Sequence, residues 1–247
     1  MNNIINRTTS PKYLIILTYT VFCLSSAIIM FVSNEVKHGL MALLFILLSV
    51  AVIIGEKVLK LEFPILFIIL VLLLCAGGLS GTIYELYVLI PYFDNILHGL
   101  SGFIFACLGF VLMKHFTSED NKSFYACLMF AVSFSLAIAV IWELFEYSTA
   151  PFGFDMLEDT IVNDIGSFLL SGGHKEVVNI NGITQTIIYY GDGNTYVIDG
   201  YLDIGIIDTI TDMFICLVGA LVFEITLIIS NIKLQTLNEL LVPKPNN

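Results

Sequence analysis

Six ionisable side chains in the second half of the chain have the types and the spacing of a metal-binding or proton-carrying site. They form three pairs: Asp94 with His98, Glu143 with Glu146, and Asp208 with Asp212. Residues three or four positions apart lie on one face of a helix, so each pair predicts a small polar patch. Several carboxylates with one imidazole suit a divalent ion such as Mg²⁺, Mn²⁺, Ca²⁺ or Zn²⁺. We therefore expect these six residues to bind a divalent metal ion or, without metal, to share protons.

The positions of these residues on their helices separate structural roles from functional ones. Asp94 and Asp208 lie near predicted helix N-termini, where a carboxylate can cap free amides and is favoured by the helix dipole. Glu143 and Glu146 lie near a helix C-terminus, where the dipole disfavours negative charge and no lysine follows nearby. These two glutamates need a cation, a proton or a hydrogen-bond donor. His98 alone would be an interior histidine, but beside carboxylates it is the predicted catalytic proton carrier.

The composition restricts the class of protein that carries these pairs. The chain has 247 residues, of which 57% are hydrophobic and only 13% charged, and its net charge is −11. An ordinary soluble domain has about twice that charged fraction, so the sequence indicates a membrane protein with the lipid bilayer as its main partner. Nucleic acid is excluded as a partner, because binding to phosphate backbones needs clustered Lys and Arg.

Apolar stretches long enough to cross a bilayer, about 17 to 25 residues each, occur six times. They cover residues 13–32, 39–54, 63–83, 96–113, 124–145 and 209–230. The expected fold is an all-α, polytopic membrane helix bundle of six transmembrane helices with a small extracytoplasmic insertion. The expected divisions are 1–147 for the first five helices, 148–207 for the insertion, and 208–247 for the sixth helix and a cytoplasmic tail.

Positive charge predicts the orientation of the helices, since Lys and Arg near helix ends stay in the cytoplasm. With six spans, one side carries eight basic residues: Arg7, Lys12, Lys57, Lys60, Lys114, Lys122, Lys233 and Lys244. The other side carries only Lys37 and Lys175. Both termini are therefore predicted to be cytoplasmic. The three polar pairs then converge at one depth near the outer surface, because the fourth and sixth helices enter there and the fifth leaves.

The insertion is the only water-soluble part of the chain. Residues 156–170 mix apolar and acidic side chains, and we expect a short amphipathic helix there. Residues 177–198 contain β-branched and tyrosine-rich runs separated by Asn181-Gly182 and by Gly191-Asp192-Gly193-Asn194. These are hairpin turn signals, so a β-hairpin is expected. Such a flap needs no chemistry of its own.

The cysteines are predicted to be structural. All five fall inside apolar spans and none forms a C-x-x-C motif: Cys23, Cys75, Cys107, Cys127 and Cys216. This distribution favours small core residues over disulfides or a zinc site.

The polar motifs also resemble a known family. The pattern consists of Asp94-x-x-x-His98-Gly99, Trp142-Glu143-x-x-Glu146, Asp208-Thr209-x-x-Asp212-Met213 and Gly219. It is similar to the YjdF-like bacterial inner-membrane proteins, a family of unknown function. The resemblance covers about residues 93–221, while the first three spans match only in hydrophobicity. It implies a helical membrane fold and the plasma membrane of a bacterium as the location, but no reaction.

A weaker similarity links the pattern to the VanZ-like proteins, which are associated with glycopeptide-antibiotic resistance. This chain departs from their pattern with Cys216, where an asparagine is expected. A role in antibiotic resistance is therefore not inferred for this chain.

Three functions fit these features. The first is a metal-dependent enzyme that acts on lipid or cell-envelope headgroups at the outer leaflet, with His98 moving a proton. The second is a transporter or channel in which the same acids bind a cation or protons. The third is a non-catalytic membrane scaffold whose flap contacts a partner. The sequence indicates neither the substrate nor the oligomeric state.

Overall fold

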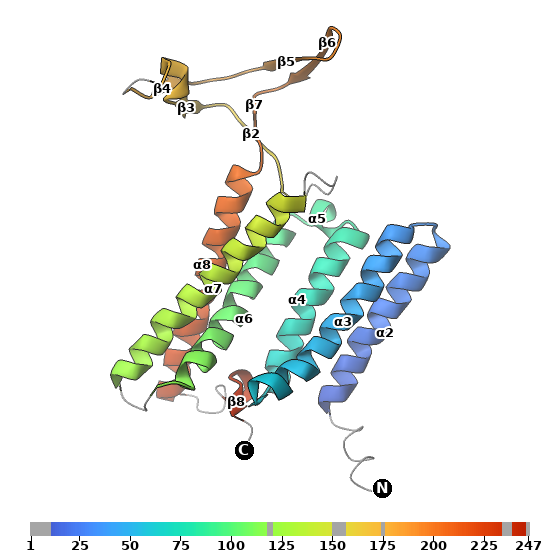
Figure 1. Ribbon diagram of the computed structural model, residues 1–247, viewed down its shortest axis with the longest axis vertical. Coiled ribbons are helices and arrows are strands. Elements are labelled where there is room, and N and C mark those ends of the chain that lie inside the picture. The colour runs from blue at the N-terminus through green and yellow to red at the C-terminus, as the bar shows by residue number, and fades with distance from the viewer. Residues whose placement is uncertain (1–10, 118–120, 150–156, 174–175, 234–238, 246–247) are drawn as a thin grey trace, which may run out of the picture. The chain divides into compact units, whose positions relative to one another are not determined.

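Uninterrupted apolar sequence folds into six long helices in the computed structural model, which describes residues 11–117, 121–149, 157–173, 176–233 and 239–245 (Figure 1). The helices are α2 (Pro11–Val32), α3 (Val36–Leu59), α4 (Ile65–Ile83), α6 (Phe93–Lys114), α7 (Asn121–Thr149) and α8 (Ile206–Lys233). Each contains a window that is long and apolar enough to cross a membrane. The six predicted spans are confirmed, with bounds that differ by a few residues because polar residues extend several helices beyond their apolar windows.

Contacts divide the chain into two units. The first contains residues 1–140 and 213–247, and the second contains residues 141–212. Both divisions fall inside single helices, one within α7 and the other within α8. Residues 141–149 and 206–212 are the ends of these two continuous helices, and residues 157–205 form the insertion.

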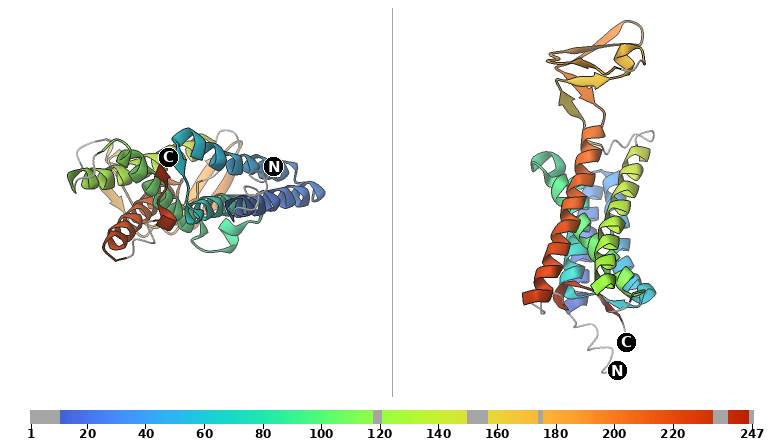
Figure 2. Two further views of the ribbon diagram at one scale, coloured as in Figure 1. Left: turned by 90° about the horizontal axis from the view of Figure 1, so that it is seen from below. Right: turned by 90° about the vertical axis from the view of Figure 1, so that its left-hand side faces the viewer.

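Short connections join the first helices of the first unit. Asn34, in the left-handed region with φ 63°, links α2 to α3, and asparagine tolerates this conformation better than most residues. Pro64 is the N-cap residue of α4, and its own backbone is extended. The short helix α5 (Leu86–Leu89) follows α4 and ends before Pro91, which cannot continue a helix hydrogen-bond ladder. The helices α2, α3, α4 and α6 then lie side by side (Figure 2).

Helix α6 is the centre of the packing. Half of its most apolar window is buried, against a third or less in the other five spans. Small residues let its neighbours approach: a Cβ at Gly102 would meet the carbonyl group of Cys216 on α8, and one at Gly219 would meet that of Gly99. Such close backbone approaches are typical of membrane helices.

Ion pairs and a strand pair join three segments of the first unit that are distant in the sequence. Lys12 Nζ lies 3.1 Å from Glu56 Oε1 and 3.5 Å from Glu62 Oε1. Strand β1 (Leu61–Glu62) pairs with β8 (Lys244–Pro245). The start of α2, the end of α3 and the C-terminal strand therefore meet at one end of the bundle.

Over its described residues, 157–173 and 176–205, the insertion contains three antiparallel strand pairs. Strand β2 (Thr160–Val162) pairs with β7 (Tyr201–Asp203), β3 (Ile165–Ser167) with β4 (Val178–Ile180), and β5 (Thr186–Tyr190) with β6 (Asn194–Ile198). The predicted hairpin is confirmed by the last pair, in which Tyr190 faces Asn194 across the turn. Gly191 and Gly193 in that turn have φ of 55° and 89°, which glycine adopts without strain.

The prediction of an amphipathic helix over residues 156–170 is wrong for residues 157–170. Met156 lies outside the described residues. Residues 157–170 instead contain β2, β3 and the start of the single-turn 3-10 helix η2 (Leu169–Ser171). Asn163 Nδ2 donates to the Ile183 carbonyl group, and Asp164 Oδ1 accepts from the Gly182 N–H, both at 2.8 Å. Pairing with distant segments therefore decides the local structure here.

Candidate metal or proton site

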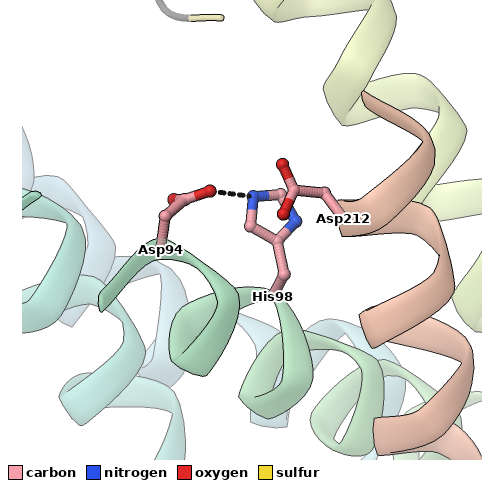
Figure 3. Close-up of side chains that lie close together, drawn as sticks. All are labelled: Asp94, His98 and Asp212. Carbon is pink, nitrogen blue, oxygen red and sulfur yellow. Dashed lines mark ion pairs between the residues drawn. The ribbon is translucent and has the colours of Figure 1, made fainter. Parts of the chain in front are cut away.

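The first turns of α6 position Asp94 and His98. Asp94 is the second residue of the helix and His98 lies one turn further, so both side chains share a face. Asp94 Oδ2 lies 3.3 Å from His98 Nε2, as the dashed line in Figure 3 shows. His98 is buried, with 7% of its surface exposed. The carboxylate is thus placed to accept a hydrogen bond from the ring and to fix its orientation.

The other side of the His98 ring faces a residue that the sequence did not point to. Cys216 on α8 places its Sγ 3.8 Å from His98 Nδ1 and donates to the His98 carbonyl oxygen at 3.2 Å. Ser101 Oγ lies 3.4 Å from the same sulfur. Cys216 is buried, as predicted for a core cysteine, but it contacts the imidazole. The only signal in the sequence is its position four residues after Asp212.

The two glutamates of α7 are buried on a helix end that is otherwise exposed. Glu143 and Glu146 are 5% and 7% exposed. Their apolar neighbours are exposed instead: Ile141, Trp142, Leu144, Phe145 and Tyr147. In a bilayer this arrangement turns the apolar side chains to lipid and the carboxylates to the protein interior, as expected for ionisable residues within a membrane.

The buried face of α7 is directed at α6. It continues the buried positions Ala131, Ser135 and Ala139 at intervals of four residues. Ser135 Oγ donates to the Gly102 carbonyl oxygen at 2.9 Å, and Gly102 lies one helical turn after His98. Helix α7 is continuous to Thr149, and Glu143 lies one turn after Ala139 on it.

Helix α8 brings Asp212 to the same place. Asp212 is 1% exposed and lies one turn before Cys216, on the same helical face. Figure 3 shows its carboxylate group beside the His98 ring. Two groups of described residues each have possible ligand atoms within 4.8 Å of one another: Asp94, His98 and Asp212, and His98, Glu143 and Glu146.

Asp208 has a different place. It belongs to neither group of described residues. Its Oδ2 accepts a hydrogen bond from the Glu158 N–H at 2.8 Å, and Asp203 Oδ2 accepts one from the Ile207 N–H at 2.8 Å. The Ile207 N–H belongs to the first turn of α8, so Asp203 has the structural role of a carboxylate at a helix N-terminus. Asp208 instead binds a backbone N–H of the insertion. Five of the six predicted site residues thus belong to two groups of three that share His98, and metal binding by all six stays a prediction.

A comparison with known families gives one match. Residues 12–233 match a family described as "Predicted membrane protein (DUF2238)". The chain belongs to this family. The YjdF-like proteins are of this family. The match includes all three N-terminal spans, so the resemblance extends well beyond residues 93–221, over which it was expected. The similarity to VanZ-like proteins stays a prediction. No curated protein and no solved structure matches the chain.

Membership in DUF2238 and six apolar helices make this chain a multi-pass protein of a lipid bilayer. The family description contains no reaction. The residues that could do chemistry lie near the ends of α6, α7 and α8.

Proposed function

We propose that the protein is a membrane enzyme that holds a divalent metal ion with Asp94, His98, Glu143, Glu146 and Asp212. The observation that carries the proposal is the burial of Glu143 and Glu146 on a helix end whose apolar residues are exposed. Burying a carboxylate is unfavourable unless a cation, a proton or hydrogen bonds compensate its charge. A divalent ion can compensate two carboxylates at once, and imidazole and carboxylate are suitable ligands for it.

The proposed substrate is a lipid or cell-envelope headgroup at the outer face of a bacterial plasma membrane. The distribution of Lys and Arg supports this orientation. The residues lie within about two turns of the ends of their helices, a depth of about 10 Å at 1.5 Å per residue. The chain has a single arginine, Arg7, which is predicted to be cytoplasmic. A phosphate-bearing headgroup would therefore be held mainly by the metal ion.

Each residue then has a role in the reaction. The bound ion supplies Lewis-acid activation of the headgroup or of a water molecule. Asp94, at 3.3 Å from Nε2, orients the ring. The other ring nitrogen of His98 would either bind the ion or move the proton of the reaction. Glu143 and Glu146 would supply the negative charge that compensates the charge of the ion.

Metal content and turnover test the proposal. Purified protein is expected to contain a divalent ion by elemental analysis, and the double variant Glu143→Gln, Glu146→Gln is expected to lose it. Glu85→Gln, which changes an exposed glutamate, is the matched control and should keep the ion. In vesicles of bacterial lipid, release of soluble headgroup is expected with the wild type and not with His98→Ala. Protein that binds no divalent ion, and is not stabilised by titrating several of them, would contradict the proposal.

A transporter is the second candidate, and Glu224 is the observation that favours it. Glu224 lies on α8 twelve residues after Asp212, about 18 Å along the helix. Its Oε1 is buried without a hydrogen-bond partner among the described residues. An acid at this depth could relay a proton or cation from the site. Flux into proteoliposomes that is lost in both Asp212→Asn and Glu224→Gln would support transport, whereas flux unchanged by Glu224→Gln would exclude this path.

A further inference from the structure

We propose that the hairpin of β5 and β6 is a docking surface for an extended, positively charged segment of another protein, which adds to the hairpin as a third strand. This surface belongs to the insertion and contains none of the proposed metal ligands. Three features of the described residues support it: free strand edges, apolar side chains on both faces, and negative charge on the same segment of the chain.

Each strand of the hairpin has one edge without a partner among the described strands. Strands β5 and β6 pair only with each other, over five residue pairs from Thr186–Ile198 to Tyr190–Asn194. Their outer edges therefore present backbone N–H and C=O groups that another strand can bind. Proteins often protect such edges with lysine or proline, and residues 186–198 contain neither. A two-stranded hairpin is only marginally stable in water, so a third strand would stabilise it.

Both faces of the hairpin carry exposed apolar side chains. Residues that are opposite in an antiparallel pair point to the same face, and successive residues alternate between the faces. All six large apolar residues of the central pairs are exposed, and Tyr189 is the most exposed at 78%. One face carries Ile187, Tyr189 and Val197, and the other carries Ile188, Tyr190 and Tyr196. An added strand would cover apolar surface on both faces at once.

Hydrogen bonds hold the base of the hairpin in place. Thr186 Oγ1 donates to the Gly200 carbonyl oxygen at 2.6 Å. Asn163 Nδ2 donates to the Ile183 carbonyl oxygen at 2.8 Å, and the Ile183 N–H donates to the Asn163 carbonyl oxygen at 2.7 Å. The strand that receives the partner is therefore already formed, which lowers the entropic cost of binding.

Charge selects the partner. Residues 157–205 contain Lys175 as their only Lys or Arg, against seven acidic residues: Glu158, Asp159, Asp164, Glu176, Asp192, Asp199 and Asp203. Asp192 lies in the hairpin turn, and Asp199 directly follows β6. Complementary charge favours a segment rich in Lys and Arg, and like charge disfavours a second copy of the insertion or an anionic lipid surface. Exposed tyrosine rings also attract such cations.

A peptide of defined sequence tests the proposal on the full-length protein, held as one chain per nanodisc of neutral lipid. The probe is a short, fluorescent peptide of alternating lysine and valine. It is expected to bind at least roughly tenfold more tightly than the same peptide with glutamate for lysine. A version that is N-methylated at every residue cannot pair as a strand, and it is expected to bind at least roughly tenfold more weakly.

Variants assign the binding to the hairpin. Tyr189→Thr with Tyr196→Thr removes an aromatic ring from each face and keeps residues that favour strands, so peptide binding is expected to weaken by at least roughly tenfold. Phe168→Thr is the matched control, because Phe168 is an exposed aromatic residue of the insertion outside the hairpin, and it should bind like the wild type. Asp192→Asn with Asp199→Asn is expected to weaken binding and its dependence on salt.

Each contrary result would overturn the proposal. Absence of binding, equal binding of the glutamate peptide, or equal binding by the double tyrosine variant would do so. Nanodiscs that pair with each other through residues 187–197 would assign the surface to a second copy of the chain. Nanodiscs that bind vesicles of phosphatidylglycerol through those residues would assign it to the membrane. Metal content is measured separately, so failure of the proposed metal site leaves these outcomes unaffected.

Discussion

At the scale of single residues, the site depends on which atoms surround one imidazole ring. His98 has a carboxylate group at Nε2 and a sulfur at Nδ1, and both contacts lie within the first unit. The two ring nitrogens are therefore not equivalent. The ring can be held in one tautomer while the other nitrogen binds an ion or moves a proton.

The buried glutamates lead to the first prediction. Glu143→Gln is expected to abolish the stabilisation of the protein by divalent ions, because the amide keeps the shape of the side chain and removes its charge. For the wild type, an ion at 100 times its dissociation constant should raise the free energy of unfolding by about 2.7 kcal/mol. Thermal unfolding in detergent, with and without the ion, measures both effects. An ion-induced shift that is equal in the variant and in the wild type would remove Glu143 from the site.

At the scale of elements, the close crossing of α6 and α8 positions the site. The two helices approach through Gly102 and Gly219, each of which leaves room for a backbone carbonyl group of the other helix. Cys216, whose backbone contacts Gly102, is the residue whose sulfur reaches His98. The close packing of α6 and α8 therefore also determines which side chains surround His98.

This crossing gives the second prediction. Gly102→Ala would place a methyl group against the Cys216 carbonyl group, so the helices must separate. We expect a loss of about 1–3 kcal/mol of stability, typical of overpacked cores, together with weaker metal binding. Gly99→Ala is the control, since its Cβ would lie at an ordinary 3.4 Å from Ile215 Cγ2. Unfolding curves and metal titrations of both variants check this, and equal behaviour would show that the crossing tolerates a methyl group.

At the scale of the whole molecule, the small β-rich insertion belongs to the second of two units, which also contains the adjoining ends of α7 and α8. Within the insertion, β5 and β6 pair only with each other among the described strands, and Thr186 and Ile198 close the base of the hairpin. Nothing in this pairing requires the hairpin for the metal ligands, which lie on α6, α7 and α8.

The third prediction follows from that separation. Replacing residues 187–197 by a short Gly-Ser linker is expected to leave metal content and ion-induced stabilisation unchanged, because Thr186 and Ile198 are already adjacent. A cellular phenotype that is lost in this variant and retained in Glu143→Gln would instead favour the scaffold function. Elemental analysis of the purified variant gives the direct test, and loss of the ion would mean that the hairpin supports the site.

The fourth prediction concerns orientation in the membrane. Eight Lys and Arg residues on one side against two on the other predict cytoplasmic termini and an external insertion. A reporter that is active only in the cytoplasm should work at the C-terminus, and one that is active only outside should work at Gly193. The reverse pattern would place the site on the cytoplasmic face and exclude outer-leaflet headgroups as substrates.

The sequence by itself determined the features that depend on neighbouring residues. Six apolar runs determine six spanning helices, because a bilayer leaves few other ways to satisfy the backbone. Spacings of three and four residues place each polar pair on one helical face, and Gly191-Asp192-Gly193 determines a hairpin turn. Each of these follows from local geometry.

Only the tertiary structure decided the features that depend on distant residues. It brought Cys216 to the His98 ring, bonded Asp208 to the backbone of Glu158, and paired β2 with β7 where the local pattern predicted a helix. The physical reason is the same in each case. A side chain or a short segment takes the partner that the packing of remote segments presents, and no pattern within a few residues contains that information.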